Sequence, residues 1–185
     1  SLWASNGLAL TSSTCGNSLG RMGEIIPDGS GNYLVSILRS VGCSNQGSGN
    51  SSQVITLKVN PSGTVLWNAS AYYPPPPPST ALINLFQIQM TSDGSGGGIV
   101  SFHENISGAG RIYAQRLDAG GALQWGGVST PVQICNTPVL GSSLATDGAG
   151  GAIWAWNDVR TGEGQLYAQK VDASGAVQWQ TNGLL

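Results

Sequence analysis

Short runs of apolar or alternating residues recur along this chain, and a glycine-containing turn follows each of the clearest ones. Three of these turns read NPSG, DAGG and DASG, and each begins with Asn or Asp. Each turn ends in glycine, and the strand after it ends in tryptophan: Gly63 and Trp67, Gly121 and Trp125, Gly175 and Trp179. An Asx start and a Gly at the fourth position suit a tight hairpin, because Gly readily takes the positive φ that follows a type I turn. The pattern therefore predicts three β-hairpins.

A second turn precedes each hairpin, at Asp28, Asp93 and Asp147, where the chain reads Asp-Gly-x-Gly. The segments 93–125 and 147–179 align without a gap over 33 positions, with sixteen identities. Each unit reads as four short antiparallel strands: one on either side of Asp-Gly, one before the hairpin and one that ends in Trp. No long segment keeps the 3.6-residue period of a helix.

The spacing of the tryptophans sets the size of the repeat. Trp3, Trp67, Trp125 and Trp179 are separated by 64, 58 and 54 residues. A four-stranded unit at this period is typical of propeller blades. The sequence predicts an all-β fold of three four-stranded antiparallel propeller-like blades, with repeats of about 54–64 residues.

The repeat boundaries follow from the same alignment. Repeat 1 is expected at 1–68 with an N-terminal partial segment, repeat 2 at 69–126 with a Pro-rich insertion, and repeat 3 at 127–180. Residues 181–185 are then the start of a further repeat or an assembly tail.

The amino-acid composition limits the classes of binding partner that the chain is expected to have. Charged residues make up 9% of the chain and the net charge is −2, so the sequence offers no basic patch for nucleic acid or anionic lipid. No apolar run approaches the ~20 residues that a membrane-spanning helix needs. A surface with so little charge opposes self-association weakly, which makes copies of the chain itself the first candidate partner.

The three cysteines, Cys15, Cys43 and Cys135, form no Cys-x-x-Cys motif, and the chain has one histidine. No zinc site and no other metal or cofactor is therefore expected. One disulfide with a spare thiol, for which Cys15 and Cys43 are the candidate pair, and three free buried thiols both remain open.

The candidate chemical groups favour structural roles. The repeated aspartates read as turn formers, because one Asp beside glycines falls short of the six to eight oxygens of a calcium site. Asp158 and Arg160 are expected to pair or to fix the loop after them. His103 lacks a nucleophile motif such as Gly-x-Ser-x-Gly, so no catalytic residue is assigned.

Other repeated side chains suggest packing. Gln115 and Gln169 recur before the hairpin, where a buried amide usually satisfies nearby backbone, and Leu57 replaces them in repeat 1. Trp154 and Trp156 share one face of a strand; they can fill the space between blades or stack on sugars.

Three Asn-x-Ser sequons, at Asn50, Asn68 and Asn105, are candidate glycosylation sites if the chain is exported.

The segment DGAGGAIWAWNDVRTGEGQLYAQKVDASGAVQW resembles a repeat of large secreted and cell-surface bacterial proteins. That repeat reads Asp-Gly-x-Gly-Gly, Trp-x-Asp-x-Arg, Ile-Tyr-Ala-Gln, Asp-x-x-Gly and Trp. The resemblance covers 93–125 and 147–179 well, and it implies propeller-like β-structure and an extracellular or cell-surface location without a catalytic activity. Repeat 1 departs from it, with Arg39-Ser40 and Ile55-Thr56-Leu57 in place of the family residues. The hairpin also resembles the Asp box of sialidase-like propellers, at a different spacing.

The number of repeats gives the functional hypothesis. Closed propellers use about four to eight blades, so three units leave a ring open. Both ends carry Trp-x-x-Asn-Gly, and we expect the terminal residues to join one subunit to the next: Leu2, Trp3, Leu8, Leu10, Leu184 and Leu185. The sequence predicts a non-enzymatic extracellular structural protein that self-assembles into a filament or a closed ring. A glycan-binding adhesion module of a larger surface protein and a fragment of a hydrolase propeller remain the alternatives.

Overall fold

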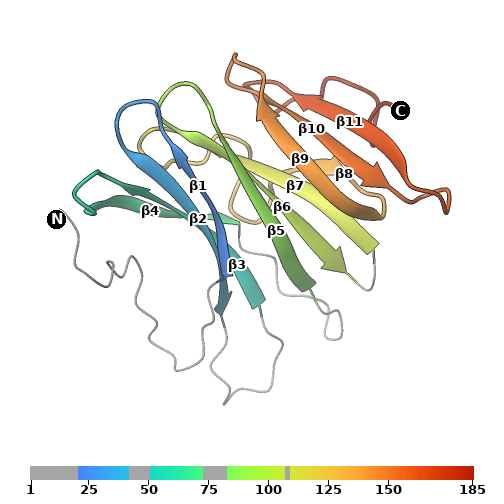
Figure 1. Cartoon of the computed structure of the whole chain (residues 1–185), viewed down its shortest axis with the longest axis horizontal. Coiled ribbons are helices and arrows are strands. Elements are labelled where there is room, and N and C mark those ends of the chain that lie inside the picture. The colour runs from blue at the N-terminus through green and yellow to red at the C-terminus, as the bar shows by residue number, and fades with distance from the viewer. Residues whose placement is uncertain (1–20, 42–50, 73–82, 107–108) are drawn as a thin grey trace.

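The structure, a computed structural model, describes residues 21–41, 51–72, 83–106 and 109–185. These residues form eleven antiparallel β-strands in three separate sheets and contain no helix (Figure 1). Nothing in this part of the chain is therefore a helix long and apolar enough to cross a membrane. The all-β prediction is confirmed.

The first sheet contains β1 (Arg21–Pro27), β2 (Tyr33–Val41), β3 (Ser51–Val59) and β4 (Val65–Tyr72) in chain order. The second contains β5 (Ile83–Ser92), β6 (Gly98–Ile106), β7 (Ala109–Leu117) and β8 (Val132–Cys135). The third contains β9 (Val139–Thr146), β10 (Ala152–Asp158) and β11 (Gln165–Val171).

The sheets follow one another across the molecule, with the second between the first and the third (Figure 1). The first strands of the three sheets, β1, β5 and β9, lie side by side, and β5 contacts both of the others. From Gly98 to Glu104, β6 is buried at every residue, whereas β10 alternates between buried and more exposed positions. A strand covered on both faces loses its polar alternation, so these patterns identify the second sheet as the central layer.

Two apolar clusters fill the spaces between the sheets. Val100 and Phe102 of β6 pack toward the first sheet, in a cluster that includes Val54. Ile99, on the opposite face of β6, belongs to a cluster that includes Trp154 of the third sheet. Each sheet thus depends on its neighbour to bury apolar surface, which is the main stabilising term in folding.

The expected four strands per unit are present in the first two sheets, and the third has three. The segment that ends in Trp is a continuous strand only in the first sheet, where β4 runs past Trp67. In the other two sheets this segment makes a single bridge, Leu117 with Leu123 and Val171 with Val177. The expectation of a regular Trp-ending strand in every unit was therefore wrong, and β8 holds the fourth place in the second sheet.

The fourth strand of the second sheet comes from beyond the expected end of repeat 2. Residues 132–135, which the alignment assigns to repeat 3, pair with β7 of the second sheet. In the third sheet, Leu184 bridges Ala168 where Val132 pairs with Ala114 in the second. The two sheets therefore begin this strand in the same way, after a loop that follows Trp125 or Trp179.

Candidate assembly interface

Each Asp-Gly-x-Gly turn is closed by its aspartate. Asp93 Oδ1 accepts hydrogen bonds from the backbone N–H groups of Ser95 and Gly97, at 2.8 and 2.9 Å. Asp28 and Asp147 make the same pair of bonds to the residues two and four positions on. The predicted turn-forming role is thus what the geometry shows, and among the described residues no group of carboxylates, His or Cys is arranged to hold a metal ion.

A basic residue from the strand before the hairpin pairs with each of these aspartates. The three ion pairs are Lys58–Asp28 at 2.8 Å, Arg116–Asp93 at 3.1 Å and Lys170–Asp147 at 3.2 Å. Burial raises the pKa of Asp28 and Asp147, but hydrogen bonds from Lys58, Lys170 and the turn N–H groups outweigh it and hold each pKa below its ordinary value. The sequence pattern did not predict these ion pairs, although each cation stands two residues before the Asx of its hairpin.

The same basic side chains reach into the next sheet. Lys58 Nζ lies 2.9 Å from the Gly96 carbonyl oxygen and 3.5 Å from that of Ala119. Arg116 Nη1 donates to the carbonyl oxygen of Ala173 at 2.9 Å. Ala119 and Ala173 hold the second position of their hairpin loops, so each cation links its own turn to the hairpin of the following sheet.

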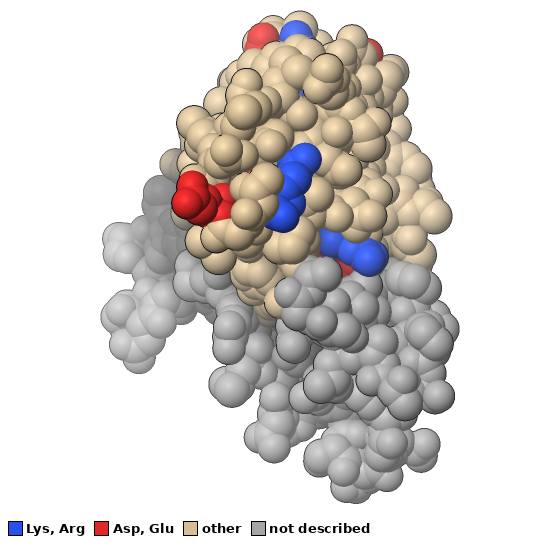
Figure 2. All heavy atoms as spheres, turned by 90° about the vertical axis from the view of Figure 1, so that its right-hand side faces the viewer, with Lys and Arg blue, Asp and Glu red and all other residues tan. Residues whose placement is uncertain are grey.

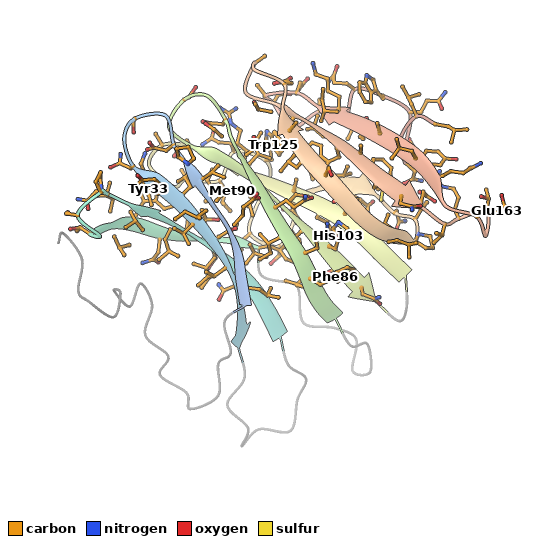
Figure 3. All side chains as sticks on the ribbon, in the orientation of Figure 1. Tyr33, Phe86, Met90, His103, Trp125 and Glu163 are labelled. Carbon is orange, nitrogen blue, oxygen red and sulfur yellow. The ribbon has the colours of Figure 1, made fainter. Side chains whose placement is uncertain are left out.

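The tryptophan of each hairpin donates to the same carbonyl as the cation. Trp67 Nε1 bonds Ala119 O at 2.9 Å, and Trp125 Nε1 bonds Ala173 O at 3.0 Å. Figure 3 shows Trp125 between the second and third sheets. We call this arrangement, in which one Trp and one cation converge on one hairpin carbonyl of the next sheet, the inter-sheet contact.

Glycine at the fourth loop position lets the tryptophan ring approach. A Cβ on Gly121 would lie 2.9 Å from the Trp67 ring, and one on Gly175 would lie 2.8 Å from Trp125 Cδ1. Both glycines also have positive φ, 86° and 89°, which side-chain-bearing residues rarely adopt. The hairpin glycines therefore serve both the turn and the packing between sheets.

On the third sheet, the donors of an inter-sheet contact face no further sheet formed by the described residues. Within the described residues nothing accepts a hydrogen bond from the indole Nε1 of Trp179. The backbone N–H of Trp179 donates to the side chain of Gln169. The side-chain exposure of the basic residue rises from 8% at Lys58 and 17% at Arg116 to 34% at Lys170. Figure 2 shows this side of the molecule, on which charged side chains are few.

The residues beside this position are also more exposed than their counterparts in the second sheet. Ile112 is 0% exposed beneath the third sheet, whereas Leu166, 54 positions on, is 70% exposed. Four further pairs of equivalent residues differ in the same way, with the second-sheet residue buried and the third-sheet residue more exposed: Ile99 and Ile153, Ser101 and Ala155, His103 and Asn157, Ala114 and Ala168. We call the third-sheet surface of Ile153, Ala155, Asn157, Leu166, Ala168, Lys170 and Trp179 the open face.

The repeated glutamines hold the loop where the fourth strand leaves the sheet. Gln115 Oε1 accepts hydrogen bonds from the backbone N–H groups of Arg116 and Trp125, at 3.0 and 2.9 Å. Gln169 does the same for Lys170 and Trp179. In the first sheet β4 is continuous and pairs directly with β3, so Leu57 needs no amide there. The expected role of these glutamines in satisfying backbone is confirmed.

Asp158 and Arg160 pair, as the sequence suggested, and also fix their surroundings. Arg160 Nε lies 2.8 Å from Asp158 Oδ1, and the guanidinium stands 4.0 Å from the centre of the Tyr167 ring. Burial raises the Asp158 pKa, but hydrogen bonds from Arg160, Thr137 and Trp156 outweigh it and hold that pKa below its ordinary value. Arg160 Nη2 also donates to Asn182 O, at 2.8 Å. The cluster therefore anchors the segment that leads to Leu184.

His103 lies in a structural bridge between the second and third sheets. Its Nε2 is 2.8 Å from Ser142 Oγ, and Ser142 donates its proton to Gln89 Oε1 at 2.9 Å. Nδ1 has no hydrogen-bond partner within the described residues, so no carboxylate there orients the imidazole as it would in a nucleophilic triad. Burial lowers the His103 pKa to about 4, and the ring packs against Phe86 (Figure 3).

The two tryptophans of β10 fill space between the sheets. Trp154 is 0% exposed and donates to Ser101 Oγ at 2.9 Å, while Trp156 is 1% exposed and donates to Asp158. Neither ring is presented to solvent, so neither can stack on a sugar in this structure. Of the two interpretations that the sequence left open, packing between sheets is the one that the geometry supports.

Several predicted residues lie outside the described part of the chain: Leu2, Trp3, Leu8, Leu10, Cys15, Cys43 and Asn50. Cys135 is a free, buried thiol, and burial raises its pKa. Of the sequons, Asn68 is exposed on β4 and Asn105 is half-buried on β6. Leu184 and Leu185 are 39% and 79% exposed.

Comparison of the sequence with protein-family models and with curated proteins finds no match.

Proposed function

We propose that this chain is a non-enzymatic structural module, built of propeller-like blades, that joins further β-repeats into an extended assembly. The observation that carries the proposal is the exposure of Leu166 on the open face, at the position where Ile112 is buried by a following sheet. An exposed apolar patch at a position built for burial is typical of an interaction surface. Copies of the chain are the proposed partners, with the terminal segments contributing to the contact.

The edge of β11 supports the same proposal. Ala168 exchanges two backbone hydrogen bonds with Leu184, at 2.8 and 2.9 Å. Leu166, two residues earlier, points its backbone groups to the same side, where no described strand pairs with it. A free strand edge can accept another strand, so this edge and the open face together favour association with copies.

The most buried of the described carboxylates serve structural contacts. Asp158 and the three turn aspartates pair with cations, and Glu104, which is buried, accepts a hydrogen bond from Tyr72 at 2.7 Å. A glycosidase needs two carboxylates facing a shared cleft. An extracellular or cell-surface location is part of the proposal, and it rests on the resemblance of the repeats.

Sedimentation velocity of the purified chain over a range of concentrations tests this function. The wild-type chain is expected to form species larger than the monomer, and Leu166→Lys is expected to reduce them by placing a charge on the open face. The matched control is Leu66→Lys, which changes a 49% exposed leucine on the first sheet and should leave association unchanged. A wild-type chain that sediments as a monomer at every concentration would contradict the proposal.

A further inference from the structure

We infer that the open face binds an Asx-x-x-Gly hairpin of a fourth β-repeat. Trp179 Nε1 and Lys170 Nζ donate hydrogen bonds to a backbone carbonyl oxygen of that hairpin. The inference rests on the proposed function, since it names the partner that this face receives. It assigns a binding role to two residues that otherwise serve only their own sheet.

The two occupied inter-sheet contacts define the geometry of this site. In each, an indole N–H lies 2.9–3.0 Å from the carbonyl oxygen of the second loop residue, and a cation reaches the same oxygen. The residue types agree in all three sheets, with Trp at the indole position and Lys or Arg at the cation position. The third sheet carries the same donors without a described acceptor.

Contacts within the third sheet already hold the Lys170 ammonium group and the backbone of Trp179. Asp147 holds Lys170 Nζ at 3.2 Å, as Asp28 and Asp93 hold their cations. Gln169 fixes the backbone of Trp179 at 3.0 Å, as Gln115 fixes that of Trp125. Donors that are held before binding lose little conformational freedom when a partner arrives.

The chemistry of the partner follows from the occupied contacts. Its hairpin needs Gly at the fourth position, because a Cβ at Gly121 or Gly175 would meet a Trp ring at 2.8–2.9 Å. The carbonyl oxygen of its second residue must also lie within reach of both donors, as those of Ala119 and Ala173 do. A glycine from the adjacent Asp-Gly-x-Gly turn must lie beside the cation, as Gly96 and Gly150 do. A generic apolar surface does not meet these requirements, whereas a further repeat of this type does.

The experiment adds such a repeat to the C-terminal end of the 185-residue chain. Residues 133–185 are joined after Leu184, because Leu184 pairs with Ala168 as Val132 pairs with Ala114. The readout is hydrogen exchange of the tryptophan indole N–H groups by NMR. In the natural chain, the Trp179 indole is expected to exchange faster than those of Trp67 and Trp125. In the extended chain the original Trp179 is expected to slow by about tenfold, the factor for one hydrogen bond of about 1.4 kcal/mol, and Trp179→Phe at that position assigns the signal.

A second variant tests the specificity of the site. Gly175→Ala in the added repeat places a methyl group against the original Trp179 ring, and fast exchange should return. A matched Gly148→Ala in the added repeat, at a position where a Cβ meets nothing within 4 Å, should keep the slow exchange.

The outcomes separate this inference from the proposed function. An added repeat that folds while the original Trp179 still exchanges fast would overturn the inference, and so would an added repeat that stays unfolded. Slow exchange in the extended chain together with a monomeric natural chain would overturn self-assembly and leave the hairpin site standing. Association of the natural chain without any slowing at Trp179 would do the reverse.

Discussion

The indole N–H of Trp125 donates a hydrogen bond to the carbonyl oxygen of Ala173, 48 residues further along the chain, at 3.0 Å. The same relationship joins Trp67 to Ala119 across 52 residues. One contact therefore connects the first sheet to the second and the second to the third, with the same atoms on each side.

The contribution of the Trp125 indole can be tested by replacing it with a smaller aromatic ring that has no N–H donor. Trp125→Phe removes the buried indole donor and some ring volume, so we expect it to lower the free energy of unfolding by about 1–3 kcal/mol. Trp179→Phe makes the identical change where no described group accepts the bond, and we expect less than about 0.5 kcal/mol. Urea denaturation followed by circular dichroism measures both. Equal losses would show that the inter-sheet contact contributes nothing beyond the ring itself.

The hairpin glycines allow packing to be separated from backbone conformation. Gly175 and Gly148 have φ of 89° and 75°, so alanine strains the backbone at both, by about 1 kcal/mol. Only at Gly175 does the new Cβ meet a ring, and overpacking of this kind costs about 1–3 kcal/mol more. Thermal and chemical denaturation of Gly175→Ala and Gly148→Ala give the difference, and equal stabilities would argue against close packing on Trp125.

The pH dependence of stability reports on His103, the one histidine of the chain. Burial lowers its pKa in the folded protein to about 4, while the unfolded chain takes up the proton near 6.5. Stability is thus highest above pH 6.5 and falls as the pH drops toward 4, by about 2 kcal/mol at pH 5.

His103→Asn is the variant that isolates this effect. It has a lower stability at pH 7, because the bridge to Ser142 is disturbed, but a flat profile between pH 7 and pH 5. Unfolding free energies from urea titrations at pH 5, 6 and 7 make the comparison. A wild-type profile that is already flat over this range would contradict the neutral, buried state of His103.

The local elements of this fold could be predicted from the sequence because their causes are local. The turn at Asp93 depends on its own glycines and on N–H groups within four residues, and the hairpin at Asp118 closes in the same way. The placement of Trp67 against Gly121 could not be predicted, since it joins segments more than 50 residues apart. The role of Arg116 was equally hidden, although its position recurs in every repeat.

The fourth strand was the main error in the predicted fold. The apolar pattern before Trp125 suggested a regular strand, but Gln115 takes the backbone bond of Trp125 and the chain leaves the sheet. Pairing with β7 resumes only at Val132, beyond a segment without periodic signal. The side chain that decides the outcome stands on a neighbouring strand, and a period-2 pattern carries no information about it.

The most direct test of the account is hydrogen exchange of the natural chain, measured by mass spectrometry at low and high protein concentration. The account predicts that the peptide 165–171, which carries Leu166, exchanges faster than the peptide 111–117 in dilute solution and becomes protected as concentration rises. Exchange at 165–171 that stays the same at every concentration would show that the open face receives no copy of this chain, and would contradict the central claim.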